Sequence, residues 1–595
     1  MPEGEKEKNP CIIYFLTISA TLGGLLFGYD TGIISGAIIL INDEFGLTSG
    51  MHQLIVASTV GSAAIFSLFS GIVADAIGRK GTIMVSAVIF TIGGVCMGVA
   101  AGPEMIILGR FIVGAAIGFV SSVVPVYISE CAPISIRGLL ITMNQLFITI
   151  GIVISSVFAG AFQGFDGGWR IMLGAGALPG VIQFIFFLGL PESPRYQLMK
   201  SQEAKAEKTL KQIRNKDDVK EELSEMKRQI EEEKMSKGWA IWQRIFTTPH
   251  IRKALFIGCM LQLFQQFCGI NAVIYYSSTI LMSAGFSSKL AIWLAVVPTT
   301  INFLATFIGL WAVESLGRKL ALALSFLAIG GALLVLTAGF LLAQLNSPEA
   351  KATNDALSIV TLCNKYPTCH ECISNGHCGY CYRIVKSEIK EGSCVNSSAE
   401  AAWAMSGRCS KNNSTKKFMV PDMSYTYNFC PSEYGWLAVL GMVLYVLGFA
   451  PGAGPMPWTI NAEIYPQWGR SIANSLAAVT NWTCNVIVSY FFLTLTMTIT
   501  AWGTFLLFCG VCIVGAIFVL AYVPETKDKS LEEVELLFMT EAVRKETLAN
   551  RQKKEEEGGG GGGVASPDNL TETDLAKKTT EPSFTLGASG STALT

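Results

Sequence analysis

Charge is scarce in this sequence. Only 15% of its 595 residues are Asp, Glu, Lys or Arg, whereas a soluble domain carries about 25%. The 44 basic residues are balanced by 45 acidic ones, and the lack of a basic excess argues against a nucleic-acid-binding protein. A glycine-rich phosphate-binding loop is also lacking, so an ATP-driven pump is not indicated. We expect neither an enzyme nor a cofactor. A mean hydropathy of +0.45 and 59 glycines are instead typical of an integral membrane protein.

Long uncharged apolar runs recur twelve times along the chain. A membrane-spanning helix needs about 20 such residues. The runs lie near 11–41, 51–74, 81–102, 105–129, 138–161, 171–190, 254–283, 290–313, 320–344, 435–462, 471–496 and 501–523. The run that begins at Cys11 is too long for a signal peptide, so it is interpreted as the first span. We therefore expect an all-α membrane protein with twelve transmembrane helices.

Positive charge alternates between the short connections. The basic connections contain Arg79, Lys80, Arg137, Arg318, Lys319 and Arg470. The connections near 42–50, 101–104, 161–169 and 497–500 contain no Lys or Arg. Because basic connections stay in the cytosol and the number of spans is even, both termini are expected in the cytosol. A plasma-membrane location is favoured, with an internal organelle left open.

The two long connections differ in composition. Residues 191–250 are highly charged, contain no Cys and predict cytosolic linker helices. Residues 346–434 hold half of the sixteen cysteines, namely Cys363, Cys369, Cys372, Cys378, Cys381, Cys394, Cys409 and Cys430. An even, dense set predicts an extracellular disulfide-rich module, although eight cysteines allow 105 pairings. His370 and His377 make a zinc site conceivable, but an outside location favours disulfides, and no metal is expected. Glycosylation sequons lie at Asn396, Asn412 and Asn413.

Two motifs occur twice. GIVADAIGRK (71–80) resembles LWAVESLGRK (310–319), and ECAPISIRG (130–138) resembles EIYPQWGRS (463–471). The two motifs are 58 residues apart in the first half, from Arg79 to Arg137, and 152 apart in the second, from Arg318 to Arg470. The excess of 94 is close to the 89 residues of the Cys-rich connection. The second half is therefore interpreted as a repeat of the first with an insertion.

The repeat defines the expected domains. They are an N-terminal six-helix half (1–190), cytosolic linker helices (191–250), the first three helices of the C-terminal half (251–345), the extracellular Cys-rich module (346–434), the last three helices (435–523) and a mostly disordered cytosolic tail (524–595). Transporters built from two parallel repeats bind substrate midway between them.

Six motifs resemble those of the sugar porters of the major facilitator superfamily. They are GRK after Asp75 and Glu314, PVYISECAPISIRG (125–138), PESPR (191–195), QQFCGIN (265–271), GPMPW (454–458) and PETK (524–527). A sugar porter with a Cys-rich module after its ninth span resembles the proton/myo-inositol cotransporters. The resemblance implies a secondary active transporter that imports myo-inositol or a related polyol with protons.

Two alternatives stay open. One is a facilitative or proton-coupled hexose transporter, and the other is a nutrient sensor or receptor that transports nothing. The expected partners are a small neutral polyol, protons and the lipid bilayer. No nucleic acid is expected, and a monomer is favoured.

Asp30 is the one charged residue between Cys11 and Ile41. An acid in the middle of a membrane helix costs about 2.5–3.5 kcal/mol on insertion scales, so it requires a function or a partner. The resemblance implies that Asp30 takes the proton and that Arg110, at the start of the fourth span, is its partner. The alternative for Asp30 is a purely structural ion pair. The alternative for Arg110 is a side chain that extends to the membrane surface.

Neutral amides are concentrated in the seventh span. Amides both donate and accept hydrogen bonds, as do the hydroxyls of a polyol. By resemblance the substrate contacts are Gln145, Gln265, Gln266, Asn271, Tyr275, Asn302, Trp458 and Asn481. The alternative for each amide is a hydrogen bond between helices.

Charged residues at the cytosolic helix ends form a further set. The resemblance implies a gate made of Asp75, Arg79, Glu130, Arg137, Glu192, Arg195, Glu314, Arg318, Glu463, Arg470 and Glu525. Surface ion pairs that contribute little are the alternative.

Overall fold

The computed structural model describes most of the chain. The described residues are 11–133, 136–235, 239–351, 362–375, 377–385, 388–397, 404–405, 408–410, 423–426, 430–466, 469–527, 529, 531–541 and 543–545. The sequons at Asn412 and Asn413 and the end of the tail lie outside them. Twelve helical stretches of the described part are long and apolar enough to cross a membrane. The predicted all-α fold with twelve spans is thereby confirmed.

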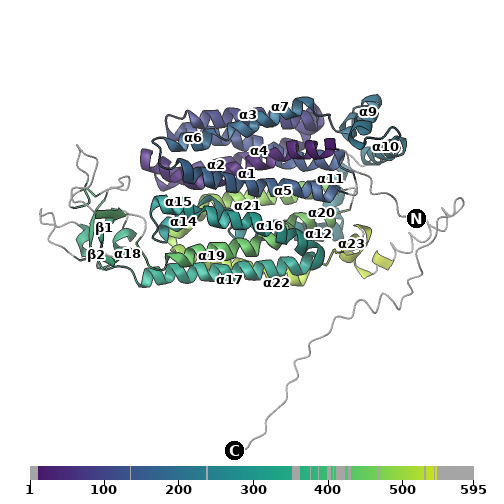
Figure 1. Cartoon of the computed structure of the whole chain (residues 1–595). Coiled ribbons are helices and arrows are strands. Elements are labelled where there is room, and N and C mark those ends of the chain that lie inside the picture. Colours follow the sequence, from purple (N-terminus) through teal and green to yellow (C-terminus); the bar gives the residue numbers. More distant parts are fainter. Residues whose placement is uncertain are drawn as a thin grey trace, which may run out of the picture. The chain divides into compact units, whose positions relative to one another are not determined.

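The first half consists of α1 (Cys11–Phe45), α2 (Ser49–Ile77), α3 (Arg79–Gly98), α4 (Pro103–Cys131), α5 (Arg137–Phe162), α6 (Gly168–Gly174) and α7 (Ala177–Gly189). Short helices follow, namely α8 (Pro194–Met199), α9 (Glu203–Arg214), α10 (Lys220–Met235) and α11 (Trp239–Thr247). The long helices run side by side, with the first half in purple to blue (Figure 1).

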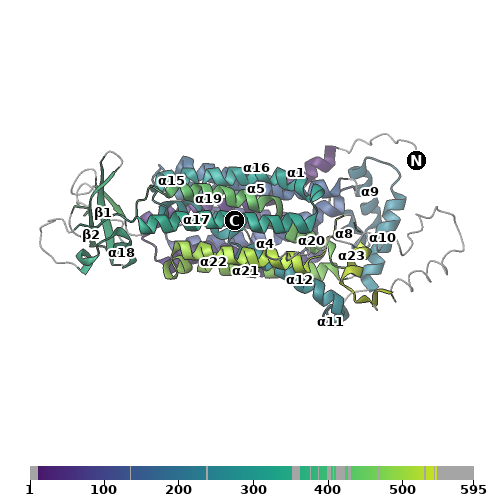
Figure 2. The same ribbon diagram turned by 90° about the horizontal axis from the view of Figure 1, so that it is seen from below.

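The second half consists of α12 (Pro249–Phe267), α13 (Ile270–Tyr275), α14 (Ser277–Ser283), α15 (Ser288–Leu294), α16 (Val296–Ser315), α17 (Arg318–Leu345), α19 (Gly435–Gly448), the π-helix η2 (Phe449–Ala453), α20 (Met456–Glu463), α21 (Arg470–Thr498), α22 (Ala501–Tyr522) and α23 (Leu531–Phe538). Figure 2 shows α17, α19 and α22 running along one another. We call the end of the bundle where α17 ends and α19 begins the module end. The opposite end, where α3 and α17 begin, is the GRK end.

The seventh and tenth spans, both in the second half, are broken in mid-course. The seventh span breaks between α12 and α13 at Gly269, which has a left-handed φ of +96°. The tenth passes from α19 through the π-turn η2, whose sequence FAPGA contains Pro451. A proline supplies no backbone N–H and interrupts the helical ladder, and π-turns are frequent at functional sites. Both breaks leave backbone carbonyls without helical partners.

The Cys-rich module is a small disulfide-bonded unit between α17 and α19. It contains the 3-10 turn η1 (Leu362–Lys365), α18 (Cys369–Ser374) and an antiparallel sheet in the order β2-β1-β3, made of β1 (Cys378–Val385), β2 (Glu388–Asn396) and β3 (Met423–Thr426). All eight of its cysteines are paired, as Cys363–Cys378, Cys369–Cys430, Cys372–Cys394 and Cys381–Cys409. The core of so small a unit depends on these bonds.

Candidate proton and substrate site

Asp30 on α1 and Arg110 on α4 form a buried ion pair. Arg110 Nη1 lies 3.3 Å from Asp30 Oδ1, and the two side chains are 1% and 5% exposed, Arg110 being the more buried. Arg110 also donates from Nε to the Ile55 carbonyl at 2.5 Å and from Nη2 to the Val56 carbonyl at 3.4 Å. The guanidinium therefore ties α1, α2 and α4 together. Its burial excludes the alternative that Arg110 extends to the surface.

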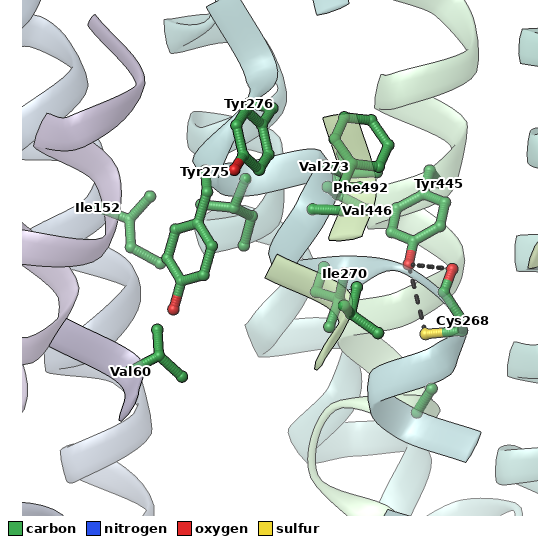
Figure 3. Close-up of a cluster of buried hydrophobic side chains, with 14 of the residues drawn as sticks. Val60, Ile152, Cys268, Ile270, Val273, Tyr275, Tyr276, Tyr445, Val446 and Phe492 are labelled. Atoms are coloured by element: carbon green, nitrogen blue, oxygen red, sulfur yellow. Dashed lines mark hydrogen bonds between the residues drawn. The ribbon is translucent and has the colours of Figure 1, made fainter. Parts of the chain in front are cut away.

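Tyr275 brings the second half to this ion pair. It is the last residue of α13 and is 3% exposed. Its hydroxyl points towards the first half, beside Ile152 of α5 and Val60 of α2 (Figure 3). Helix α13, which carries Tyr275, packs against α1, which carries Asp30. A predicted substrate contact and the predicted proton site are therefore neighbours.

The amides of the seventh and eleventh spans form one network. Asn481 of α21 donates to Gln265 Oε1 at 2.7 Å and accepts from Gln266 Nε2 at 3.1 Å. Asn271 donates to Gln266 Oε1 at 2.7 Å. Gln265 donates in turn to the carbonyls of Ala453 and Gly454, at 2.8 and 2.7 Å. The network thus uses carbonyls that the π-turn of the tenth span releases.

Gln262 is a member of this network that the sequence analysis missed. Asn481 donates to its Oε1 at 2.7 Å, and its Nε2 is buried without a hydrogen-bond partner among the described residues. Gln262 precedes Gln266 by one helical turn, so both lie on one face of α12. That spacing is the signal that could have identified it.

The break between α12 and α13 is stabilised from behind. The Tyr445 hydroxyl of α19 donates to the Cys268 carbonyl at 3.1 Å and lies 3.3 Å from its Sγ (Figure 3). Tyr445 is completely buried. It satisfies a carbonyl that the helix break leaves free, and so holds the adjoining glutamines in place.

Three predicted substrate residues lie apart from the network. Within the described part of the chain, no hydrogen bond joins the side chains of Gln145, Asn302 or Trp458 to it. Asn302 lines a small cavity with Val273 and Thr299. Gln145 is exposed, and Trp458 is 45% exposed. In this conformation the structure brings together Gln265, Gln266, Asn271 and Asn481, and Gln145, Asn302 and Trp458 lie outside their network.

The gate residues form two matching clusters at the GRK end. In the first half Arg79 Nε lies 3.1 Å from Glu130, which also accepts from the Ser193 hydroxyl, and Glu192 accepts from the N–H groups of Arg79 and Lys80. In the second half Arg318 contacts Glu463 at 3.1 Å. Glu463 also accepts from the Thr526 hydroxyl, and Glu525 accepts from the N–H groups of Arg318 and Lys319. PESPR and PETK therefore occupy equivalent positions.

The glycine of each GRK motif explains this arrangement. Gly78 and Gly317 have φ of +91° and +82°, a region that side chains disfavour. A Cβ at either position would overlap the carboxylate of Glu192 or Glu525. Each glycine thus lets a carboxylate reach the first N–H groups of the next helix, where the helix dipole favours negative charge.

The remaining gate residues are placed as follows. Asp75 contacts Arg79 at 3.0 Å, and Arg470 donates to the Tyr465 carbonyl. Arg137 begins α5, Arg195 lies in α8, and the side chain of Glu314 lies outside the described part. The ion pairs Asp75–Arg79, Arg79–Glu130 and Arg318–Glu463 each join residues of the same half.

The two halves are joined at the module end. The Ser35 hydroxyl of α1 lies 2.7 Å from that of Ser277 and accepts from the Ser278 N–H at 2.9 Å. Gln53 of α2 donates to Thr494 of α21 at 2.9 Å. These hydrogen bonds seal the module end in this conformation.

Comparison with known proteins identifies the class. The family model described as "Sugar (and other) transporter" matches residues 16–376 and 418–538, so the chain belongs to this transporter family and is not an enzyme. It is 43% identical over 546 residues to the proton myo-inositol cotransporter of Homo sapiens, covering 90% of this chain and 83% of the relative. It is 35% identical to proton myo-inositol cotransporter hmit-1.2 of Caenorhabditis elegans, covering 92% and 94%.

A solved structure agrees with the architecture. The partially occluded inward open conformation of the xylose transporter XylE from E. coli matches with a TM-score of 0.64 at 23% identity, covering 88% of this chain and all of that one. At this identity the similarity concerns the fold alone. With twelve candidate spans and its place in a transporter family, the protein is a multi-pass membrane transporter.

Proposed function

We propose that this transporter imports myo-inositol, or a closely related polyol, together with protons by alternating access. The observation that carries the proposal is the buried Asp30–Arg110 pair within a sugar-transporter fold. The names of the human and nematode relatives, both proton myo-inositol cotransporters, support the substrate and the coupling ion. The substrates are a small neutral polyol and the proton, and the transporter works as a monomer in the plasma membrane.

The proton step takes place at Asp30. Burial favours the neutral carboxyl group, whereas Arg110 favours the carboxylate, so a small change in their separation moves the proton. Protonation removes the attraction between Asp30 and Arg110, while Arg110 keeps its bonds to the carbonyls of Ile55 and Val56. Helix α1 is then free to move against α2 and α4, which links proton binding to conformation.

The substrate step takes place at the amide network. In the absence of substrate the amides satisfy one another. Polyol hydroxyls, which donate and accept, replace these bonds, so the buried amides stay satisfied when substrate enters. Gln145, Asn302 and Trp458 complete the site from other helices, with the Trp458 ring packed on C–H groups of the substrate. Tyr275 lies between this site and Asp30 and connects the two steps.

The GRK end provides the gate. We place this end and both termini in the cytosol, which makes the module extracellular and allows glycosylation at Asn396, Asn412 and Asn413. The two capped clusters move as rigid parts of their halves. They approach each other when the transporter opens outwards and separate when it opens inwards.

The test is uptake of labelled myo-inositol and of labelled glucose at external pH of about 5.5 and about 7.5, with current recorded. We expect inositol uptake that rises with acidity and is accompanied by inward current. Uptake of glucose in preference to inositol would identify a hexose transporter. No uptake of either by protein at the cell surface would favour a sensor.

A further inference from the structure

His52 has a hydrogen-bonding atom that the structure leaves unused. It lies in the first turn of α2, at the module end. Its Nε2 is buried without a hydrogen-bond partner among the described residues. Buried polar atoms are nearly always hydrogen-bonded, so this exception requires an explanation.

The ring of His52 lies in the contact between the two halves. Its centroid is 5.7 Å from that of Tyr276, which belongs to the second half, and the ring planes are inclined by 36°. Tyr276 is fixed in turn by Phe492, at 5.1 Å between centroids, and by a 2.9 Å hydrogen bond to the Ser489 carbonyl. The neighbouring Gln53 donates to Thr494 across the same interface. His52 as a whole is partly exposed, but its Nε2 is buried. Separation of the halves at this end must therefore part His52 from Tyr276 and expose Nε2 to water.

His52 is also connected to the proton site through α2. His52, Ile55, Val56 and Thr59 follow the spacing of one helix face. The carbonyls of Ile55 and Val56 accept from Arg110, so His52 stands about one helical turn, roughly 5.4 Å, closer to the module end than the groups that hold Arg110.

None of the charged groups of the described helices around His52 accepts a hydrogen bond from its Nε2. Helix α4 contributes Arg110 and, in its first turn, Glu104, while α1 contributes Asp30, which is bound to Arg110. The module-end halves of α3 and α21 contain no Asp, Glu, Lys, Arg or His. Asp43 and Glu44 lie at the module end of α1, and Glu44 is bound by Arg170. Since no acceptor reaches Nε2, the sealed interface accommodates the neutral ring better than the charged one.

We propose that His52 makes the closure of the module end sensitive to protons, in addition to the coupling residue Asp30. On the acidic side the exposed imidazole takes a proton, and the charged ring keeps the halves apart so that substrate can enter. The ring must lose this proton to the same side before it packs against Tyr276 again. His52 therefore changes how easily external substrate is captured, without changing the number of protons carried. The proposal rests on the proposed function, since it assigns a second residue to the same transport cycle.

The test uses His52→Phe, which keeps a ring and cannot titrate, and His52→Gln, which keeps polarity. The half-saturation concentration for external myo-inositol is measured by exchange at zero membrane potential between about pH 7.5 and 5.5. We expect it to fall about threefold or more in the parent protein, within the limit of about tenfold per pH unit for one group. Both variants should show a weaker pH dependence, with the contribution of Asp30 remaining, while keeping proton-driven accumulation. His377→Gln, an exposed histidine of the module, is the matched control and should keep the parent profile.

The two proposals can fail separately. In an Asp30→Asn background the exchange profile should still depend on pH, and adding His52→Phe should flatten it. If His52→Phe and His52→Gln both keep the full pH dependence in the parent background, the assignment to His52 is wrong. If Asp30→Asn still accumulates substrate, the coupling proposal is wrong, whatever the result at His52.

Discussion

The two halves of the bundle share one architecture and differ in the chemistry at their centres. The first half buries a charged pair, Asp30 and Arg110. The second half buries a set of neutral amides centred on Asn481. A group that binds and releases a proton must change its charge, whereas a site for a polyol needs donors and acceptors without the cost of burying charge. The difference supports our proposal that the proton binds in the first half and that most of the substrate contacts lie in the second.

At the GRK end, in contrast, the two halves have the same chemistry. Arg79, Glu130, Glu192 and Ser193 in the first half have the same contacts as Arg318, Glu463, Glu525 and Thr526 in the second. The two halves are thus most alike at the proposed gate, and they differ where we propose that they bind different ligands.

The largest effect is expected at the charged pair. Asp30→Asn keeps the shape of the side chain and removes its ability to carry a proton. One proton supplies about 2.3 kcal/mol per 100 mV and about 1.4 kcal/mol per pH unit, which together support an inositol gradient of several hundredfold. The variant should lose this accumulation and the inward current, as measured by steady-state uptake and voltage clamp, while exchange persists.

Arg110→Ala sharpens this prediction. Without Arg110, the buried carboxyl group should hold its proton more tightly and release it poorly inside, so accumulation should also fail. An undiminished inward current in Asp30→Asn, at normal surface expression, would show that the proton binds elsewhere.

A smaller effect is expected at the amides. Gln265→Ala removes a side chain that accepts from Asn481 and donates to the carbonyls of Ala453 and Gly454. An unmade buried hydrogen bond costs about 1–3 kcal/mol, so the half-saturation concentration should rise about 5-fold to 150-fold. Gln344→Ala, which removes an acceptor of the Trp502 indole outside this network, is the matched control and should leave it unchanged. An unaltered value in a well-folded Gln265→Ala would remove this residue from the site.

The next effect tests the equivalence of the two halves at the GRK end. Glu192→Ala and Glu525→Ala each remove the carboxylate that accepts from the first N–H groups of α3 or α17. Loss of such a capping group costs about 0.5–2 kcal/mol, and we expect similar losses of thermal stability in purified protein. Glu207→Ala, in an exposed ion pair with Lys211, should have no measurable effect. A large loss in one capping variant and none in the other would contradict the equivalence.

How far the sequence predicts the structure depends on the range of the interactions. The twelve spans follow from local hydropathy, and the repeat from motif spacing. The expected meeting of Asp30 and Arg110 came from the family resemblance. The bonds of Gln265 to Ala453 and Gly454 depend on a π-turn 188 residues away, which no local pattern shows. The contact of His52 with Tyr276 likewise joins different halves, and only the folded chain brings the two together.

The smallest effect on transport is expected in the module. The double variant Cys369→Ser/Cys430→Ser removes the disulfide that joins α18 to the segment before α19. Loss of a native disulfide in a small domain costs about 2–5 kcal/mol, because the unfolded chain is no longer constrained. Asp30 and all residues of the amide network lie outside the module. The molecules that reach the surface should therefore bind inositol normally. We expect surface biotinylation to fall severalfold while the half-saturation concentration, corrected for surface protein, changes by less than about twofold.

Variants at Cys381 and Cys409, whose disulfide joins β1 to the segment before β3, provide the matched comparison. If the Cys369–Cys430 variant alone raised the half-saturation concentration at normal surface density, the module would be part of the transport machinery, and the division of chemistry between the two halves would be incomplete.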